Sequence, residues 1–171
     1  MRLKQVVLSL CILVLTVSVF SETLCLYVEE RTNGEFGPFP PPTKEGIYYG
    51  LFDGNHIVFD MGDKNILNVN WGKQDFSSAL NISLEGGARY FVAVKVNTKQ
   101  VKSKERKVHV KTSASYYLYD ARYSKLIVKG NIKGSNEGEE NRINQSKLDF
   151  SLGEKIAGIV NRSIKEYVDK L

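Results

Sequence analysis

Residues 108–118 read VHVKTSASYYL, and this stretch decides the fold class. Valine, threonine, alanine, tyrosine and leucine occupy every second position from Val108 to Leu118, while residues such as His109 and Lys111 fall between them. A period of two is that of a β-strand, whose alternate side chains point to opposite faces of a sheet. We therefore expect a long strand with one buried face and one solvated face.

Strands are also expected on either side of this stretch. Residues 90–96 (YFVAVKV) begin apolar on both faces, which is typical of a central strand covered by helices. After a turn at residues 120–124, apolar and polar side chains alternate again from Leu126 to Ile132. The three segments predict a three-strand antiparallel meander.

Two strands and two short helices are expected before the meander. The apolar segments 24–28 and 56–60 have the length and composition of strands. Helices are expected to begin at Thr43 and at Asp75, whose side chains can cap free amide groups. The glycine pair 86–87 should end the second helix, because glycine tolerates the left-handed backbone of a helix end.

A long helix is expected at the carboxyl end. Ser151 and Glu154 have the spacing of a capping box at its start. An apolar stripe at helical spacing follows, formed by Leu152, Ile156, Ile159, Val160, Ile164, Tyr167, Val168 and Leu171. This stripe must be buried, and the sheet is the nearest partner. The predicted fold class is α/β (α+β), with two layers, a mixed sheet of about five strands, two short helices and a long carboxy-terminal helix packed on the sheet.

Two segments are expected to connect these elements. The proline-rich residues 35–42 suit an extended connector, because proline lacks an amide donor and has a fixed φ. A proline-rich ligand for a partner's aromatic groove is the alternative interpretation. Residues 135–147 are polar and contain little apolar surface to offset their ordering entropy, so we expect a mobile loop there.

The amino-terminal residues 1–21 have the layout of a secretory signal peptide. A basic start is followed by an apolar run of about 15 residues, whereas a membrane-spanning helix needs about 20. We place the cut between Ser21 and Glu22; a retained membrane anchor and a buried helix are the alternatives. A single exported domain, residues 22–171, is then expected. Its composition is that of one globular unit, since 42% of the whole chain is hydrophobic and 25% charged.

Cys25 is the one cysteine that remains after this cut, because Cys11 leaves with the signal. A lone cysteine near a signal run can be a lipid-attachment site, but Leu24 stands where lipoprotein processing expects a small residue. We therefore interpret Cys25 as a small hydrophobic residue of the first strand and disfavour a lipid anchor. The exported protein is expected to be periplasmic or secreted.

Motifs for catalysis, cofactors or metals are missing from the sequence. His56 and His109 both fall in expected strands, without cysteine, histidine or carboxylate neighbours at metal-ligand spacing. No nucleophile elbow, phosphate-binding glycine loop or HExxH helix is present. We expect a protein that is not an enzyme and has no cofactor. A hydrolase assembled around the two histidines is the remaining catalytic alternative.

Two groups of side chains are candidates for a partner surface. One is a basic cluster between the third and fourth strands, formed by Lys99, Lys102, Lys104, Arg106 and Lys107. The other is a tyrosine group near one strand end, formed by Tyr116, Tyr117, Tyr119 and Tyr123. Contact with anionic lipid headgroups is one interpretation of the basic cluster, and export makes nucleic acid the weaker one. Asn81, Asn144 and Asn161 each begin a glycosylation sequon.

Two local motifs resemble a known group of small periplasmic α/β domains. Residues 87–90 (GARY) lead into the expected central strand, where that group has Gly-Ala-Asp-Tyr, so Arg89 replaces the acid. Residues 118–120 (LYD) and 126–128 (LIV) flank a turn in which Ser124 stands where glycine is usual. The group includes the curli-secretion lipoprotein, the amino-terminal domain of TolB and the penicillin-binding-protein activator lipoproteins.

The resemblance implies a non-catalytic envelope protein that docks on another protein or on the membrane. Our main hypothesis is accordingly an exported module for protein interaction, assembly or transport, with an envelope protein as partner. The alternative is a module that binds a small molecule or lipid between the final helix and the sheet. The sequence does not determine the oligomeric state.

Overall fold

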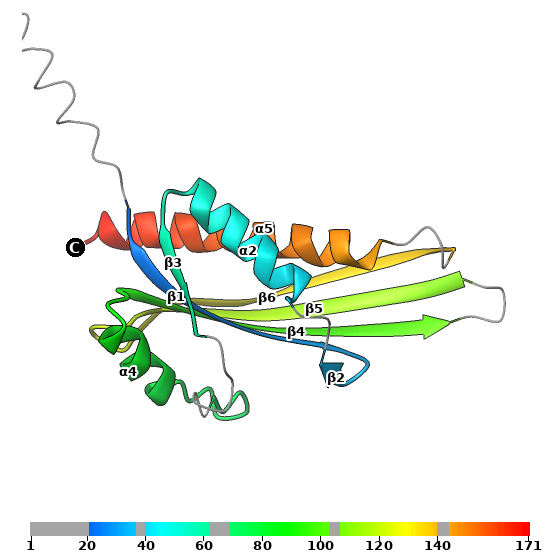
Figure 1. The fold of residues 1–171 in the computed structure, drawn as a ribbon, viewed down its shortest axis with the longest axis horizontal. Helices are drawn as coiled ribbons and strands as arrows, with labels where there is room; N and C mark the ends of the chain where they lie inside the picture. Colours follow the sequence, from blue (N-terminus) through cyan, green and yellow to red (C-terminus); the bar gives the residue numbers. More distant parts are fainter. Residues whose placement is uncertain (1–20, 37–39, 62–68, 103–106, 140–143) are drawn as a thin grey trace, which may run out of the picture.

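A computed structural model describes residues 21–36, 40–61, 69–102, 107–139 and 144–171. Within these ranges the chain forms one sheet and three helices (Figure 1). The elements are, in order, β1 (Thr23–Thr32), β2 (Glu35–Phe36), α2 (Pro42–Asp53), β3 (Ile57–Asp60), α4 (Ser77–Glu85), β4 (Tyr90–Lys102), β5 (Lys107–Asp120), β6 (Lys125–Glu139) and α5 (Gln145–Val168).

The sheet is mixed, and its strand order is β2-β1-β4-β5-β6. β1 runs parallel to both β3 and β4, with Leu24 opposite Val58 on one side and Tyr90 on the other. β4, β5 and β6 form the predicted antiparallel meander. β1 accompanies β4 only as far as the Thr32–Thr98 pair, so β5 is the one described strand beside the last residues of β4. Beyond that pair, the Gln100 amide donates to Asn33 Oδ1 at 2.9 Å.

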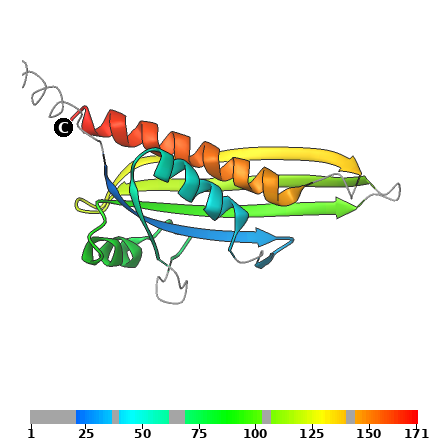
Figure 2. The same ribbon diagram turned by 45° about the horizontal axis from the view of Figure 1, so that its top comes forward.

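Helices α2 and α5 lie side by side over one face of the sheet (Figure 2). The even-numbered residues of β4 and β5 face them, as the alternation predicted. The core between these layers contains Leu26, Val92 and Leu118 from the sheet, and Ile47 and Ile156 from the helices. The long helix therefore buries its apolar stripe on the sheet, and the predicted α/β class is confirmed.

The crossing of α2 and α5 depends on small residues. Gly153 of α5 lies against the backbone of Thr43 and Ile47, and Gly46 of α2 lies against the Phe150 carbonyl group. Added Cβ atoms at these glycines would overlap with backbone atoms of the facing helix. This close approach seats both helices on the same face of the sheet.

Helix α4 lies on the opposite face (Figure 1), so helices cover part of the sheet on both sides. Phe76, Ala79 and Leu80 pack there against Cys25 and Phe91. This second core occupies one end of the sheet only. The other end of β4, β5 and β6 carries no described helix on that face.

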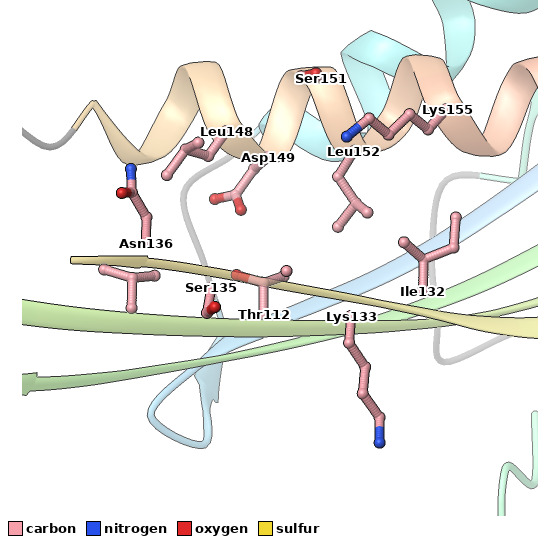
Figure 3. Close-up of a pocket in the computed structure, with 12 residues that line it drawn as sticks. Thr112, Ile132, Lys133, Ser135, Asn136, Leu148, Asp149, Ser151, Leu152 and Lys155 are labelled. Carbon is pink, nitrogen blue, oxygen red and sulfur yellow. The ribbon is translucent and has the colours of Figure 1, made fainter.

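The start of α5 differs from the prediction. The helix begins at Gln145, and the Asn144 side chain caps it by accepting a hydrogen bond from the Lys147 amide at 3.0 Å. Ser151 and Glu154 lie inside the helix, so the predicted capping box is wrong. The earlier start lets Leu148 and Asp149 of the first turns reach the sheet (Figure 3).

The predicted mobile loop at 135–147 is also corrected at both ends. β6 continues through residues 135–139, which pair with residues 107–111 of β5. The last part of the expected loop belongs to α5, and residues 140–143 lie outside the described ranges. Within the proline-rich connector, Glu35–Phe36 forms β2 on the edge of β1.

The two short helices also begin differently from the prediction. Pro41 is the cap position of α2, and Thr43 lies inside its first turn, where its amide donates to Glu30 Oε2 at 3.3 Å. α4 begins at Ser77 after Phe76, although Asp75 still accepts a hydrogen bond from the Ser77 amide at 3.1 Å. Its predicted end is confirmed, because Gly87 has a φ of 81°.

The predicted signal peptide lies almost entirely outside the described ranges, which begin at Ser21. In the part of the chain that is described, no helix combines the length and apolar character needed to span a bilayer.

Candidate interaction sites

The predicted tyrosine group is divided between the two faces of the sheet. Tyr117 and Tyr119 pack against Phe76 beside α4, with ring centroids 5.1 and 5.7 Å from it. Tyr116 is buried on the α5 face. Tyr123 is 64% exposed in the β5–β6 turn, with the Arg122 guanidinium 5.3 Å from its ring. Most of these rings therefore belong to the cores.

The predicted basic cluster is described only in part, and its described residues belong to two strands. Lys99 is exposed on β4, and Lys102 and Lys107 belong to β4 and β5 rather than to a loop. Lys104 and Arg106 lie outside the described ranges. Tyr123 and the described lysines of this cluster lie at opposite ends of β5, so they do not form one surface.

A different basic surface lies on the helix-free face of the meander. Lys99 of β4 pairs directly with Lys111 of β5, and Lys133 of β6 pairs with Ser113 of β5. All three lysines are exposed, and Figure 3 shows Lys133 pointing away from α5. We call this surface the lysine face, formed by Lys99, Lys111 and Lys133 with Asn97, Ser113 and Ser135.

The lysine face is hollowed. A depression of about 370 Å³ is lined by the six residues of the lysine face and by Thr112 and Gly134. Ammonium, hydroxyl and amide groups are thus concentrated in one place, and none of the lining residues is acidic. This set of donors suits an anionic ligand.

Two neighbouring lysines on the same face already have partners. Lys95 lies 3.5 Å from the Glu29 carboxylate and 5.5 Å from the centre of the Trp71 ring. Lys129 donates to Gln74 Oε1 at 3.3 Å. By contrast, the side chains of Lys99, Lys111 and Lys133 make no hydrogen bond or ion pair with any side chain that the structure describes. The unneutralised charge is therefore at the end of the sheet that α4 leaves bare.

Glu29 is held ionised by its surroundings. Partial burial alone would raise the pKa of this carboxyl group, but hydrogen bonds from Trp71 and Arg31 and the charge of Lys95 outweigh it. The Trp71 Nε1 atom donates to Glu29 Oε2 at 3.0 Å. The pKa of Glu29 therefore lies below its ordinary value, and its carboxylate already interacts with Trp71, Arg31 and Lys95.

A second candidate site lies between the first turns of α5 and the sheet (Figure 3). This α5 cavity has a volume of about 200 Å³, and its walls include Val110, Ile132 and Leu152. Asp149 points from α5 toward the sheet and provides a buried carboxyl group, with an exposed fraction of 3%. The helix–sheet interface predicted for a ligand thus contains a cavity.

The carboxyl group of Asp149 belongs to a buried polar cluster with Glu30, Thr43 and Gln145. Gln145 Nε2 donates to Asp149 Oδ1 at 2.6 Å, and Glu30 is 4% exposed. Burial raises the pKa of Asp149, and this hydrogen bond opposes the rise in part. Burial also raises the pKa of Glu30, and the nearby Asp149 adds to it against hydrogen bonding from Thr43.

The histidines lie in separate places. His56 is buried just before β3, and its Nδ1 atom accepts a hydrogen bond from the Glu22 amide at 3.2 Å. Burial lowers the pKa of His56 despite the opposing charge of Glu22. His109 is half-buried in β5. Among the described residues, no three His, Cys, Asp or Glu side chains gather where a metal ion would bind.

Cys25 lies in β1, buried beside α4 with a free thiol. Burial raises the pKa of this thiol. The structure thus places Cys25 where the sequence predicted it, among the hydrophobic residues of the first strand.

Comparisons with known proteins concern the fold. The sequence matches no protein-family model and no curated protein sequence. The structure is similar to that of XCC0632 from Xanthomonas campestris, a DUF330 protein, with 7% identity over 87% of this chain and 89% of that chain and a TM-score of 0.55. It is also similar to the PelC dodecamer from Paraburkholderia phytofirmans, with 16% identity, coverage of 82% and 86%, and a TM-score of 0.52.

A further match is lipoprotein GNA1162 from Neisseria meningitidis, with 13% identity, coverage of 84% and 99%, and a TM-score of 0.48. At such identities the likeness concerns the fold alone. At that level the predicted resemblance to a group of small periplasmic α/β domains is confirmed.

Proposed function

We propose that the chain is an exported, non-catalytic accessory protein of the cell envelope that works by binding a protein partner. The observation that carries this proposal is the lysine face, an exposed and hollowed surface with three lysines and no acidic lining residue. It lies on the part of its sheet face that no described helix covers. Assembly through protein contacts is compatible with this fold, since the PelC structure is a dodecamer.

Two structural features support the export part of the proposal. β1 begins at Thr23, so a cut between Ser21 and Glu22 leaves the strand whole. Processing before Cys25 would instead remove Leu24, which is fully buried and pairs with both β3 and β4. An unlipidated mature chain that begins at Glu22 is therefore the form we expect.

Mass spectrometry of the protein recovered from its native envelope tests this form. The expected mass is that of residues 22–171 without a lipid. A mature chain that begins at Cys25, or that retains the apolar run of residues 6–20, would contradict the proposal.

Partner binding is tested by crosslinking in the native cell followed by capture. A face variant carries Lys99→Ala, Lys111→Ala and Lys133→Ala, and a control variant carries Lys73→Ala, Lys165→Ala and Lys170→Ala at exposed positions elsewhere. The wild type and the control should enrich the same protein, and the face variant should enrich it about tenfold less, as loss of three exposed charge contacts implies. Equal enrichment by all three would contradict the proposal.

The α5 cavity favours a second candidate function, the binding of a small molecule or lipid tail. Its apolar walls and single buried acid have the character of a ligand site, although the volume of about 200 Å³ restricts the ligand to a small group. Native mass spectrometry of the protein from its own envelope should then show an adduct. Ile132→Trp, which fills the cavity, should remove the adduct, and an adduct unchanged by this substitution would contradict the candidate.

A further inference from the structure

We propose that the lysine face binds an acidic segment of the partner in an extended conformation, with alternate carboxylates over Lys99, Lys111 and Lys133. This inference rests on the proposed function and specifies the chemistry of the partner. Three features of the lysine face support the inference: its three lysines without described side-chain partners, the spacing of these lysines, and the projection of α4 from the same face of the sheet.

The lysine face has three basic residues and no acidic residue among those that line it. Lys99 and Lys111 face each other directly across the β4–β5 pair, an arrangement in which like charges destabilise a sheet. Further along the same face, Lys95 forms an ion pair with Glu29 and Lys129 donates a hydrogen bond to Gln74. Carboxylates from outside would give Lys99, Lys111 and Lys133 the partners that the described side chains do not supply.

Hydrogen-bond donors between the lysines suit the same ligand. Ser113 lies between Asn97 and Lys133 in the register, and Ser135 lies opposite Lys111. Hydroxyl and amide groups can donate to carboxylate oxygens or to the main-chain carbonyl groups of an extended peptide. The hollow therefore offers both charge and neutral donors across three strands.

The spacing of the lysines favours an extended segment. Directly paired residues such as Lys99 and Lys111 have Cβ atoms about 5 Å apart, and diagonal neighbours such as Lys111 and Lys133 lie about 7–8 Å apart. Alternate residues of an extended peptide are about 6.6 Å apart and point to the same side. Acidic residues at every second position therefore match the lysines, whereas consecutive acids would point half of their carboxylates away.

Helix α4 argues against a flat membrane as the occupant. It lies on the same face of the sheet at the other end (Figure 1), and a helix with its side chains is about 10 Å thick. The lysines thus lie at the lower level of a step on this face. A narrow peptide reaches that level, whereas a planar bilayer meets α4 first.

Binding of synthetic peptides to the mature protein tests the inference. The probes are three capped octapeptides, ETETETET, its neutral analogue QTQTQTQT, and EEEETTTT with the same charge in consecutive positions. At low salt ETETETET should bind about tenfold more tightly than the neutral analogue and about threefold more tightly than EEEETTTT. The face variant should lose this preference, the control variant should keep it, and 0.5 M salt should abolish most of the binding.

Two other probes define the outcomes that would overturn the inference. Vesicles with 30% phosphatidylglycerol that bind the wild type but not the face variant, with no preference for ETETETET, would assign the surface to a membrane. Inorganic phosphate that binds as well as ETETETET would reduce it to a simple anion site. If no peptide binds while envelope capture still depends on the three lysines, the acidic segment is wrong and the proposed function stands.

Discussion

Two carboxyl groups, those of Glu30 and Asp149, lie inside the molecule beneath α2 and α5, and an imidazole, that of His56, is buried near β3. Burial acts on them in opposite directions, because it always disfavours the charged form. It raises the pKa of both acids and lowers the pKa of the histidine. These residues should therefore give the free energy of unfolding two separate dependences on pH.

Asp149→Asn should stabilise the protein at pH 7 by roughly 1 kcal/mol, the scale of one imperfectly satisfied buried polar group. With a raised pKa, folded Asp149 holds its proton more tightly than the unfolded chain, so stability falls as the pH rises above about 4. The asparagine amide cannot ionise, so the stability of the variant should not fall in this way as the pH rises. Denaturant unfolding between pH 4 and 8 measures the free energy of unfolding of both proteins, with Glu154→Gln at an exposed position as the control. Parallel curves for wild type and Asp149→Asn would contradict the interpretation.

His56→Asn should reduce the loss of stability that the wild type shows as the pH falls below 7. Because the folded pKa of His56 is lowered, its contribution to stability is complete above the ordinary imidazole pKa of about 6.5 and is lost as the pH falls toward the folded pKa. Asparagine can still accept the hydrogen bond from the Glu22 amide but cannot take up a proton in this range. Thermal unfolding between pH 7 and 5 should show a smaller decrease than in the wild type. The matched change His109→Asn should retain that decrease.

The pairing of α2 with α5 sets how the helical layer sits on the sheet. Its small residues place backbone against backbone, so no side chain can give way at the crossing. Two glycines of α5 make this testable, because Gly153 faces α2 and Gly158 is exposed with no atom within 4 Å of an added Cβ.

Gly153→Ala should cost about 2 kcal/mol in the free energy of unfolding, because the helices must separate to admit a methyl group. Gly158→Ala should instead stabilise the protein by about 0.8 kcal/mol, since alanine is the better helix former. Equilibrium unfolding of the two variants measures both. Similar effects at the two positions would show that the crossing tolerates a wider spacing.

The elements that the sequence predicts well are those with one buried face. β5 alternates regularly because α5 and α2 cover one side of it, and the apolar stripe of α5 arises in the same way. The second half of β6 was missed because residues 135–139 are polar, and main-chain pairing with β5 holds them in place. The start of α5 was missed because Ser151 and Glu154 imitate a cap, whereas Asn144 provides it.

The lysine face could not be predicted because it depends on register. Lys99 and Lys111 are 12 residues apart and meet only because β4 and β5 pair in one alignment, which brings Lys133 beside them through β6. The sequence showed a basic segment near Lys99 but gave no reason to join it to Lys111. The α5 cavity was easier to anticipate, since the final helix had to pack on the sheet.

At the scale of the whole molecule, the sheet has a firmly packed half and a less supported half. Residues 91–96 of β4 lie between β1 and β5 and under helices on one or both sides, whereas residues 99–102 pair with β5 alone. Local opening should therefore be easier in the half that carries the lysine face.

Hydrogen exchange should show this division. Amides of residues 99–102 should exchange at least about 100-fold faster than those of residues 91–96, because β1 does not extend beside them. The slowest of the four should be the Gln100 amide, which donates to Asn33 Oδ1. Addition of ETETETET should slow exchange at Lys99 and Lys111 and leave α4 unchanged. Uniform protection along β4 would contradict the division.

The interior position of β1 has a consequence for how the chain folds. This strand is the first element of the described chain, yet Leu24 pairs with Val58 and with Tyr90, which follow it by 34 and 66 residues. Such distant pairings raise the contact order and slow folding, because a long loop must close before the pairs form. A chain emerging amino end first therefore remains unfolded until β4 has been made. On the export route proposed above, this delay would keep the polypeptide loose enough to pass through a translocation channel.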